Sequence, residues 1–232
     1  MSDAIQSVQH FIDAATRERG NLDVLEAGCG SASYLVFGPK ARIVGIDISQ
    51  QQLDRNASLD EMILGDIQEH EFAPSSFDVI VCWDVLEHLA EPKAALVRFA
   101  AALRDDGIVI LKLPNVLSFK GLLTKYLPYS AHVFLYRYVS GNPNAGSGDV
   151  GPFATPMRFS ISADGIRKFA AENGLSEVYF ATWDAASDEF WWRRYPWTLH
   201  VYVVLRAAAG FLSFGRLGES DFVIVLRKGA VR

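Results

Sequence analysis

Short apolar runs alternate with amphipathic segments along the first half of the chain. Residues 3–19 place apolar side chains at helical spacing and so predict a helix. Apolar runs predict buried strands at 24–27, 43–46, 78–82 and 108–113, and the segments between them predict helices near 49–57 and 91–104. Strands that alternate with helices imply βαβ units and a parallel sheet covered on both faces.

The second half contains two long insertions and fewer strands. The first insertion, residues 114–160, predicts short apolar helices at 116–127 and 131–139 and a loop at 142–149. Residues 162–173 predict a helix that Ser162 caps and Gly174 ends. Strands are expected at 176–182 and 221–227, with a second insertion, 184–218, between them.

Composition indicates one globular domain over residues 1–232. Half of the 232 residues are apolar and 21% are charged, which is ordinary for a globular protein. The net charge of −5 argues against a nucleic-acid partner, because phosphate binding needs a surplus of Lys and Arg. Two cysteines cannot form a disulfide scaffold and the N-terminus lacks signal-peptide features, so a cytoplasmic location is expected.

A glycine turn and two aspartates follow successive predicted strands. Gly28 and Gly30 come directly after Glu26, and glycines allow a ligand to approach the backbone closely. Asp47 ends the second strand, where it can accept hydrogen bonds from ribose hydroxyls or cap the next helix. Asp66 follows the third strand and can accept from an adenine amine, or serve only as a turn residue. Together they predict a ligand that contains adenosine.

The turn does not favour a dinucleotide. A dinucleotide site needs a third glycine and a helix N-terminus aimed at the pyrophosphate. The segment Gly28-Cys-Gly30-Ser-Ala-Ser33 has no third glycine, and the chain has no Lys-Ser/Thr phosphate loop. Nothing in this region is expected to cradle phosphate.

An ordered series of motifs resembles the class I S-adenosylmethionine-dependent methyltransferases, and within them the broad group that contains ubiquinone-type O-methyltransferases. The resemblance covers residues 22–113 and continues more loosely over 158–175 and the last strand. Its motifs are Leu25-Glu-Ala-Gly-Cys-Gly30, Val44-Gly-Ile-Asp-Ile-Ser49, Gly65-Asp-Ile67, Ser76-Phe-Asp-Val-Ile80, Val85-Leu-Glu-His-Leu89 and Leu103-Arg-Asp-Asp-Gly107.

The resemblance implies an α/β fold with a Rossmann-like sheet of seven strands, the last one antiparallel, and helical, aromatic insertions that form a cap. It implies that S-adenosylmethionine is the cofactor and S-adenosylhomocysteine its product. The implied cofactor-binding residues are Glu26 (methionine ammonium), Gly28 and Gly30 (beneath the cofactor), Asp47 (ribose) with Ile48, Asp66 and Ile67 (adenine), and Cys82 and Trp83 (methionine and methyl side). This chain departs from the pattern at Ala32, where the family has a third glycine, and its first two helices are expected to be short.

Methyl transfer from a sulfonium needs alignment first and a base second. Direct displacement depends mainly on positioning, and a hydroxyl acceptor also benefits from a base. His88, which follows the fourth strand, is the catalytic candidate, although the same residue could only brace the start of a helix.

Asp84, Glu87 and His88 resemble the acidic-plus-His cluster that binds a divalent metal in some ubiquinone-type enzymes. The same spacing arises by chance on one helical face, so no metal is predicted. Cys29 and Cys82 are interpreted as packing residues, because no partner for nucleophilic chemistry accompanies them.

Aromatic residues are concentrated in the half of the chain that is expected to bind the acceptor. Of the 28 aromatics, seven lie in residues 1–113 and 21 in residues 114–232. Residues 22–113 are therefore interpreted as the cofactor-binding half, and the insertions 114–160 and 184–218 as the cap that selects the substrate. The second insertion is the richest in tryptophan and arginine, with Trp183 just before it and Trp191, Trp192, Arg193, Arg194 and Trp197 within it.

Three interpretations of the insertions remain open. They are a packed helical cap, a pocket for an aromatic, glycosyl or lipid-like acceptor, and a peripheral membrane or dimer contact. His200 and Arg206 interrupt the apolar stretch 195–214, so no membrane span is predicted.

The sequence therefore predicts a methyltransferase of EC 2.1.1 type that acts on a small-molecule or lipid/glycan-linked acceptor, with oxygen as the expected methylated atom. The alternatives are a non-catalytic binding module with the same fold and an RNA methyltransferase. The sequence predicts no oligomeric state.

Overall fold

The computed structural model describes residues 3–17, 20–139, 141–147, 151–153, 155–184 and 218–229, together with residues 197, 200, 203, 204, 207 and 208. Most of the second insertion lies outside these residues. The predictions made for Trp191, Trp192, Arg193 and Arg194 fall there.

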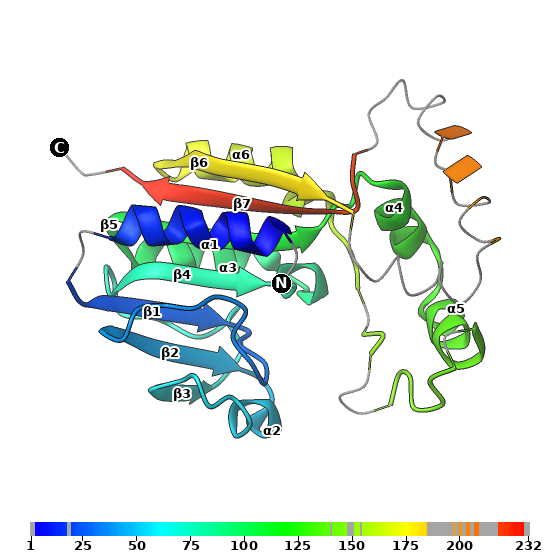
Figure 1. Ribbon diagram of the computed structural model, residues 1–232, viewed down its shortest axis with the longest axis horizontal. Coiled ribbons are helices and arrows are strands. Elements are labelled where there is room, and N and C mark those ends of the chain that lie inside the picture. Colours follow the sequence, from blue (N-terminus) through cyan, green and yellow to red (C-terminus); the bar gives the residue numbers. More distant parts are fainter. Residues whose placement is uncertain are drawn as a thin grey trace.

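The described residues form a seven-stranded sheet in the order β3-β2-β1-β4-β5-β7-β6 (Figure 1). Strands β1 to β5 are parallel, and β7 runs antiparallel to both of its neighbours, which confirms the predicted fold class. The bounds are β1 Leu22–Ala27, β2 Ala41–Asp47, β3 Glu61–Leu64, β4 Phe77–Trp83, β5 Leu103–Pro114, β6 Leu175–Trp183 and β7 Asp221–Lys228.

The strand order reverses between β1 and β4. From β1 the chain builds outward to β2 and β3, and then crosses back to β4 on the other side of β1. Loops leave the carboxyl ends of β1 and β4 in opposite directions at such a point, and open α/β sheets bind their ligands in the crevice between them. The topology therefore places the candidate site at the carboxyl ends of β1, β2 and β4.

Helices cover both faces of the sheet. On one face α1 (Asp3–Thr16) buries Val8 and Ile12 against apolar residues of β1, β4, β5 and β7. On the other face α3 (Pro92–Ala102) and α6 (Ala163–Glu172) bury Phe99 and Ile166 in a second core cluster (Figure 1). Ser162 caps α6 and Gly174 follows it with a φ of +69°, as predicted.

The connection from β1 to β2 corrects one expectation. A short helix was expected there, but none of residues 28–40 is helical. Residues 28–40 instead form turns, bends and irregular chain. Their Leu35 is buried and packs in the core cluster that includes Val8 and Ile12 of α1.

The second helix, α2 (Gln50–Leu53), is short, as the departures from the family pattern led us to expect. It ends four residues before the predicted range of 49–57 does.

The first insertion lies beyond the carboxyl ends of the parallel strands, at the right of Figure 1. It contains α4 (Phe119–Tyr126), α5 (Tyr129–Phe134) and a π-helical segment, η2 (Leu135–Val139), close to the two predicted helices. A β-bridge joins Ser118 to Gly218, so the start of the first insertion lies beside the end of the second. Within the described part of the chain, no helix has both the length and the apolar character needed to cross a membrane.

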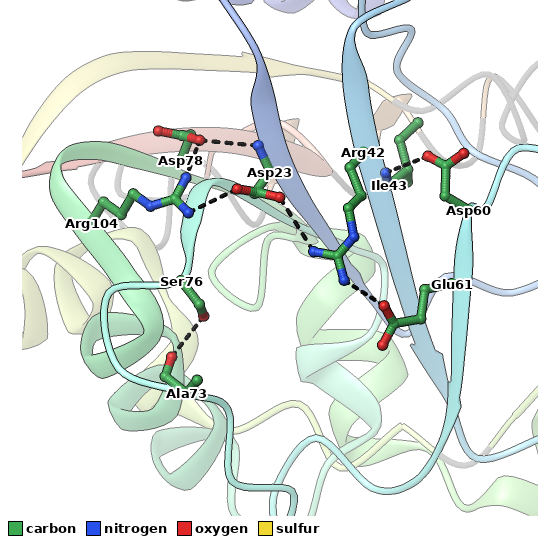
Figure 2. Close-up of polar contacts among 9 residues, drawn as sticks. All are labelled: Asp23, Arg42, Ile43, Asp60, Glu61, Ala73, Ser76, Asp78 and Arg104. Carbon is green, nitrogen blue, oxygen red and sulfur yellow. Dashed lines mark hydrogen bonds and ion pairs between the residues drawn. The ribbon is translucent and has the colours of Figure 1, made fainter.

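The amino-terminal ends of the parallel strands, opposite the candidate site, carry a network of ion pairs (Figure 2). Arg104 of β5 bonds Asp78 of β4 at 2.5 Å and Asp23 of β1 at 2.8 Å. Arg42 of β2 bonds Asp23 at 3.3 Å and Glu61 of β3 at 2.5 Å. The network thus ties together the amino ends of five parallel strands, far along the strands from the candidate site.

Candidate functional site

The turn after β1 is shaped for close approach. Gly28 and Gly30 have φ angles of +72° and +55°, a region that side chains disfavour. The Gly28 and Cys29 N–H groups both donate to Ile46 O, at 2.8 and 3.1 Å, and so hold the turn against β2. A Cβ on Gly28 would lie 2.5 Å from Val85 Cγ2, whereas a Cβ on Gly30 would meet nothing within 4 Å. Gly30 therefore leaves open space above the turn.

Asp47 connects this turn to the end of β2. Its Oδ2 accepts from Gly30 N at 2.9 Å and its Oδ1 accepts from Ser49 N at 2.9 Å. Ser49, and not Asp47, caps α2, because its hydroxyl accepts from Gln52 N. Each carboxylate oxygen can accept more than one hydrogen bond, so Asp47 retains acceptor capacity for a ligand.

Glu26 carries a buried carboxylate that is only half satisfied. It is 4% exposed, and its Oε2 accepts from Ser33 Oγ at 2.5 Å. Its Oε1 is buried without a hydrogen-bond partner among the described residues. Burial raises the pKa of Glu26, although the Ser33 hydrogen bond acts in the opposite direction. A buried acceptor that lacks a protein donor fits a ligand that brings one.

Glu26 is among the residues that line a small hollow beside the glycine turn. The Trp83 ring forms one wall and stacks on the Tyr34 ring, with 5.4 Å between centroids and an interplanar angle of 14°. Ser33 and Tyr34 were not among the predicted cofactor-binding residues, and only their position directly after the glycine turn could have indicated that they line the site. The lining residues are Glu26, Ala27, Gly28, Cys29, Ala32, Ser33, Tyr34, Val81 and Trp83.

Cys82 and Trp83 lie on opposite faces of β4. Trp83 lines the hollow, whereas the Cys82 side chain is 1% exposed within the core cluster on the side of α3. Consecutive strand residues point to opposite faces, so of these two side chains only that of Trp83 lines the hollow. Burial raises the pKa of the Cys82 thiol well above its ordinary value, and raises that of Cys29 to about 12.

Asp66 forms a local turn at the end of β3. Its Oδ1 accepts from Gln68 N at 2.7 Å, and the Gln68 side chain donates to both carboxylate oxygens. Ile67 is 4% exposed and belongs to the core cluster. Ile48, by contrast, is 76% exposed beside Asp47 and offers apolar surface at the edge of the site.

A buried lysine links two aspartates at the ends of β4 and β7. Lys112 Nζ donates to Asp84 Oδ1 at 2.5 Å and to Asp221 Oδ1 at 2.7 Å. Burial disfavours the charge of Lys112, but the two aspartates outweigh it and raise its pKa. Asp84 adopts a φ of +54°, which is unusual for a residue with a side chain.

Glu87 and His88 lie in a single 3-10 turn, η1 (Leu86–His88). Glu87 is 4% exposed, its Oε2 has no partner among the described residues, and burial followed by the charge of Asp84 raises its pKa to about 8. His88 Nδ1 lies 3.4 Å from Thr155 Oγ1, and its ring meets Phe153 edge-on at 6.0 Å. These contacts with Thr155 and Phe153 place His88 where the first insertion meets the sheet, and the His88 side chain is one-third exposed there.

The residues that resemble a metal cluster do not fit a metal ion here. Lys112 already lies on Asp84, and its ammonium repels a second cation. In the part of the chain that the structure describes, no three His, Cys, Asp or Glu side chains gather in a way that could hold one.

Comparison with known proteins identifies the fold and the family of the N-terminal part. Residues 2–141 match the family described as "Methyltransferase domain". The chain is 28% identical over 115 residues to a ubiquinone biosynthesis O-methyltransferase of Idiomarina loihiensis, an alignment that covers 45% of this chain and 47% of that protein. The chain thus spans about half of that relative's length, and 36% and 28% of two other curated relatives.

Solved structures share the fold over almost the whole chain. The YcgJ protein of Bacillus subtilis superposes with a TM-score of 0.60 at 15% identity and covers 97% of this chain and 100% of its own. A magnesium protoporphyrin IX methyltransferase of Synechocystis, crystallised with bound S-adenosylmethionine, has a TM-score of 0.55 at 15% identity, with 97% and 78% covered.

Proposed function

The chain belongs to the family of class I S-adenosylmethionine-dependent methyltransferases, and from this membership we propose that it transfers a methyl group from S-adenosylmethionine to a small-molecule acceptor. The observation that carries the proposal is the buried Oε1 of Glu26, which has no partner among the described residues and belongs to a residue that lines the hollow beside the glycine turn. The ammonium group of the cofactor is a donor and a cation, and so satisfies this oxygen in both respects.

The neighbouring residues are assigned to the rest of the cofactor. Each Asp47 oxygen accepts one bond from a backbone N–H group and can accept another, so Asp47 is assigned to the ribose hydroxyls. Gly28 and Gly30 form the floor, and Ile48 packs beside the adenine, with Asp66 at its amine. Trp83 lies on the methyl side, while Cys82 contributes backbone alone because its side chain is in the core.

The transfer itself depends on alignment. S-adenosylmethionine supplies a methyl group that its sulfonium sulfur already activates. The chain would hold the acceptor in line with that group, and His88 would take the proton of an acceptor hydroxyl as the methyl carbon's bond to sulfur breaks and its bond to oxygen forms, which leaves S-adenosylhomocysteine. His88 suits this role because it is partly exposed and its ring contacts Thr155 of the first insertion.

The acceptor is assigned to the aromatic insertions. The ubiquinone O-methyltransferase relatives support O-methylation, and the exposed rings of Phe153 and Phe159 support an aromatic, glycan-linked or lipid-like acceptor. In this assignment residues 22–113 bind the cofactor, and residues 114–160 and 184–218 select the acceptor.

Isothermal titration with S-adenosylhomocysteine tests the cofactor assignment. Saturable binding by the folded chain is expected, and its absence contradicts the proposal. A methyl-transfer screen over phenols, sugars and lipid-linked acceptors, read as S-adenosylhomocysteine formed, then tests the acceptor class. Turnover of nitrogen nucleophiles alone contradicts the assignment to oxygen.

A further inference from the structure

Lys112 is placed at the centre of the carboxyl edge of the sheet. Strand β5 lies between β4 and β7, and Lys112 is the β5 residue level with Trp83, the last residue of β4. Its side chain therefore reaches Asp84, just after β4, and Asp221, the first residue of β7. Ser220 Oγ donates to the second oxygen of Asp221 at 2.7 Å, which holds that carboxylate in place.

The Lys112 ammonium already pairs with the carboxylate that a divalent cation at the Asp84, Glu87 and His88 cluster would use. Asp84 is the more accessible of the two carboxylates in the Asp84, Glu87 and His88 cluster, with 38% of its side chain exposed against 4% for Glu87. Lys112 is 11% exposed and Asp221 is 6% exposed. A metal ion bound to Asp84 would lie beside this buried ammonium, and the two cations would repel each other at close range. The Lys112 ammonium thus supplies a positive charge to both carboxylates, and neither needs a metal ion for that purpose.

We propose that Lys112 is a built-in cation that replaces a divalent metal at this cluster, so that the chain works without one. The inference rests on the proposed function for its context, but the metal-binding part stands on the geometry of the three side chains alone.

Lys112 also acts as a positioning residue. Asp84 has a left-handed backbone conformation at the point where the chain leaves β4, and the ion pair with Lys112 holds it there. The 3-10 turn with Glu87 and His88 begins two residues later. Lys112 therefore helps to hold the backbone from which the turn with His88 begins.

A manganese titration of the full chain tests the proposal without an acceptor. After trace metal is removed with a chelator, free Mn²⁺ is followed by electron paramagnetic resonance. We expect wild-type chain to leave Mn²⁺ free at millimolar concentration. Lys112→Met is expected to bind it and to gain several degrees in melting temperature as Mn²⁺ is added, because Asp84 and Asp221 then lack a cation. Lys112→Arg, which keeps the cation, and Lys93→Met, at an exposed position, are expected to behave like wild type.

Two outcomes overturn the inference. One is saturable Mn²⁺ binding by wild-type chain, a measurement that requires no variant to fold. The other is a folded Lys112→Met chain that leaves Mn²⁺ free. S-adenosylhomocysteine affinity, measured on the same samples, reports on the proposed function separately, so the two failures are distinguishable.

Discussion

The Gly30 N–H donates to Asp47 Oδ2 at 2.9 Å, and this bond joins the turn after β1 to the end of β2. The aspartate assigned to the ribose therefore also shapes the floor beneath the cofactor. A substitution at Asp47 acts on both at once.

Asp47→Ala is expected to lower the affinity for S-adenosylhomocysteine by about 100-fold or more, because hydrogen bonds to a charged group contribute about 1.5–3 kcal/mol each. Asp47→Asn keeps one acceptor oxygen and is expected to lose less, about 10-fold. Calorimetric titration measures both. Asp54→Asn, at an exposed aspartate after α2, is the control and should bind normally. Wild-type affinity in Asp47→Ala would show that the ribose site is misplaced.

Glu26→Gln is expected to stabilise the unliganded chain and weaken cofactor binding. Burial raises the pKa of Glu26, so the destabilisation by its ionised form is absent below the pKa of the unfolded chain and grows as pH rises through the folded pKa. The melting temperature of the unliganded variant at neutral pH is therefore expected to rise, by about 2–4 °C for each 1 kcal/mol of stability gained. Loss of the charged partner for the ammonium is expected to lower S-adenosylhomocysteine affinity by about 10-fold or more. A variant that loses stability, or binds as wild type, contradicts the assignment.

Glu87 predicts a pH dependence of stability. Burial raises its pKa to about 8 in the folded chain, above its value in the unfolded chain. The folded state therefore holds a proton that the unfolded state releases, and stability falls as pH rises from about 4.5 to about 8, by at most about 1.4 kcal/mol per pH unit. Denaturant titrations across this pH range should show that the free energy of unfolding decreases less in Glu87→Gln than in the wild-type chain. The exposed Glu71→Gln should retain the full wild-type decrease, and equal slopes in all three chains would refute the prediction.

The two glycines of the turn should fail in different ways. Gly28→Ala combines a left-handed backbone with a Cβ 2.5 Å from Val85, so we expect it to prevent stable folding. Gly30→Ala meets only the backbone penalty, about 1–2 kcal/mol, because the space above it is open. It should fold but bind S-adenosylhomocysteine weakly, since the new methyl group enters the cofactor's place. Thermal melts of both variants measure folding, and titrations with S-adenosylhomocysteine measure binding. Normal binding by Gly30→Ala would contradict the proposal that this turn lies beneath the cofactor.

Arg104→Met should separate stability from binding. Arg104 joins β1, β4 and β5 at the amino edge through Asp23 and Asp78, and these partly exposed ion pairs contribute about 1 kcal/mol. The free energy of unfolding is expected to fall by that amount while S-adenosylhomocysteine affinity stays unchanged. Arg42→Met, at a more exposed position of the same network, should lose less. A large loss of affinity in Arg104→Met would show coupling between the two edges of the sheet.

Local patterns predicted most of the elements because their causes are local. Helical spacing in residues 3–19 predicted α1, and Ser162 with Gly174 predicted both ends of α6. The absence of a helix after β1 was not predicted, because the contacts of this segment are with distant parts of the chain: Gly28 and Cys29 bond Ile46 of β2, and Leu35 packs with α1.

By itself, the sequence determined the order of strands and helices, the glycine turn, and the presence of Glu26 and Asp47 at strand ends, because spacing along the chain is enough to place these features. Only the tertiary structure decided which carboxylate oxygens remain unpaired and which face each strand residue occupies, as Cys82 and Trp83 show. It alone revealed that Lys112 reaches both Asp84 and Asp221. Those contacts join residues as far as 109 positions apart, and their partners become neighbours only when strands far apart in the chain pair within one sheet.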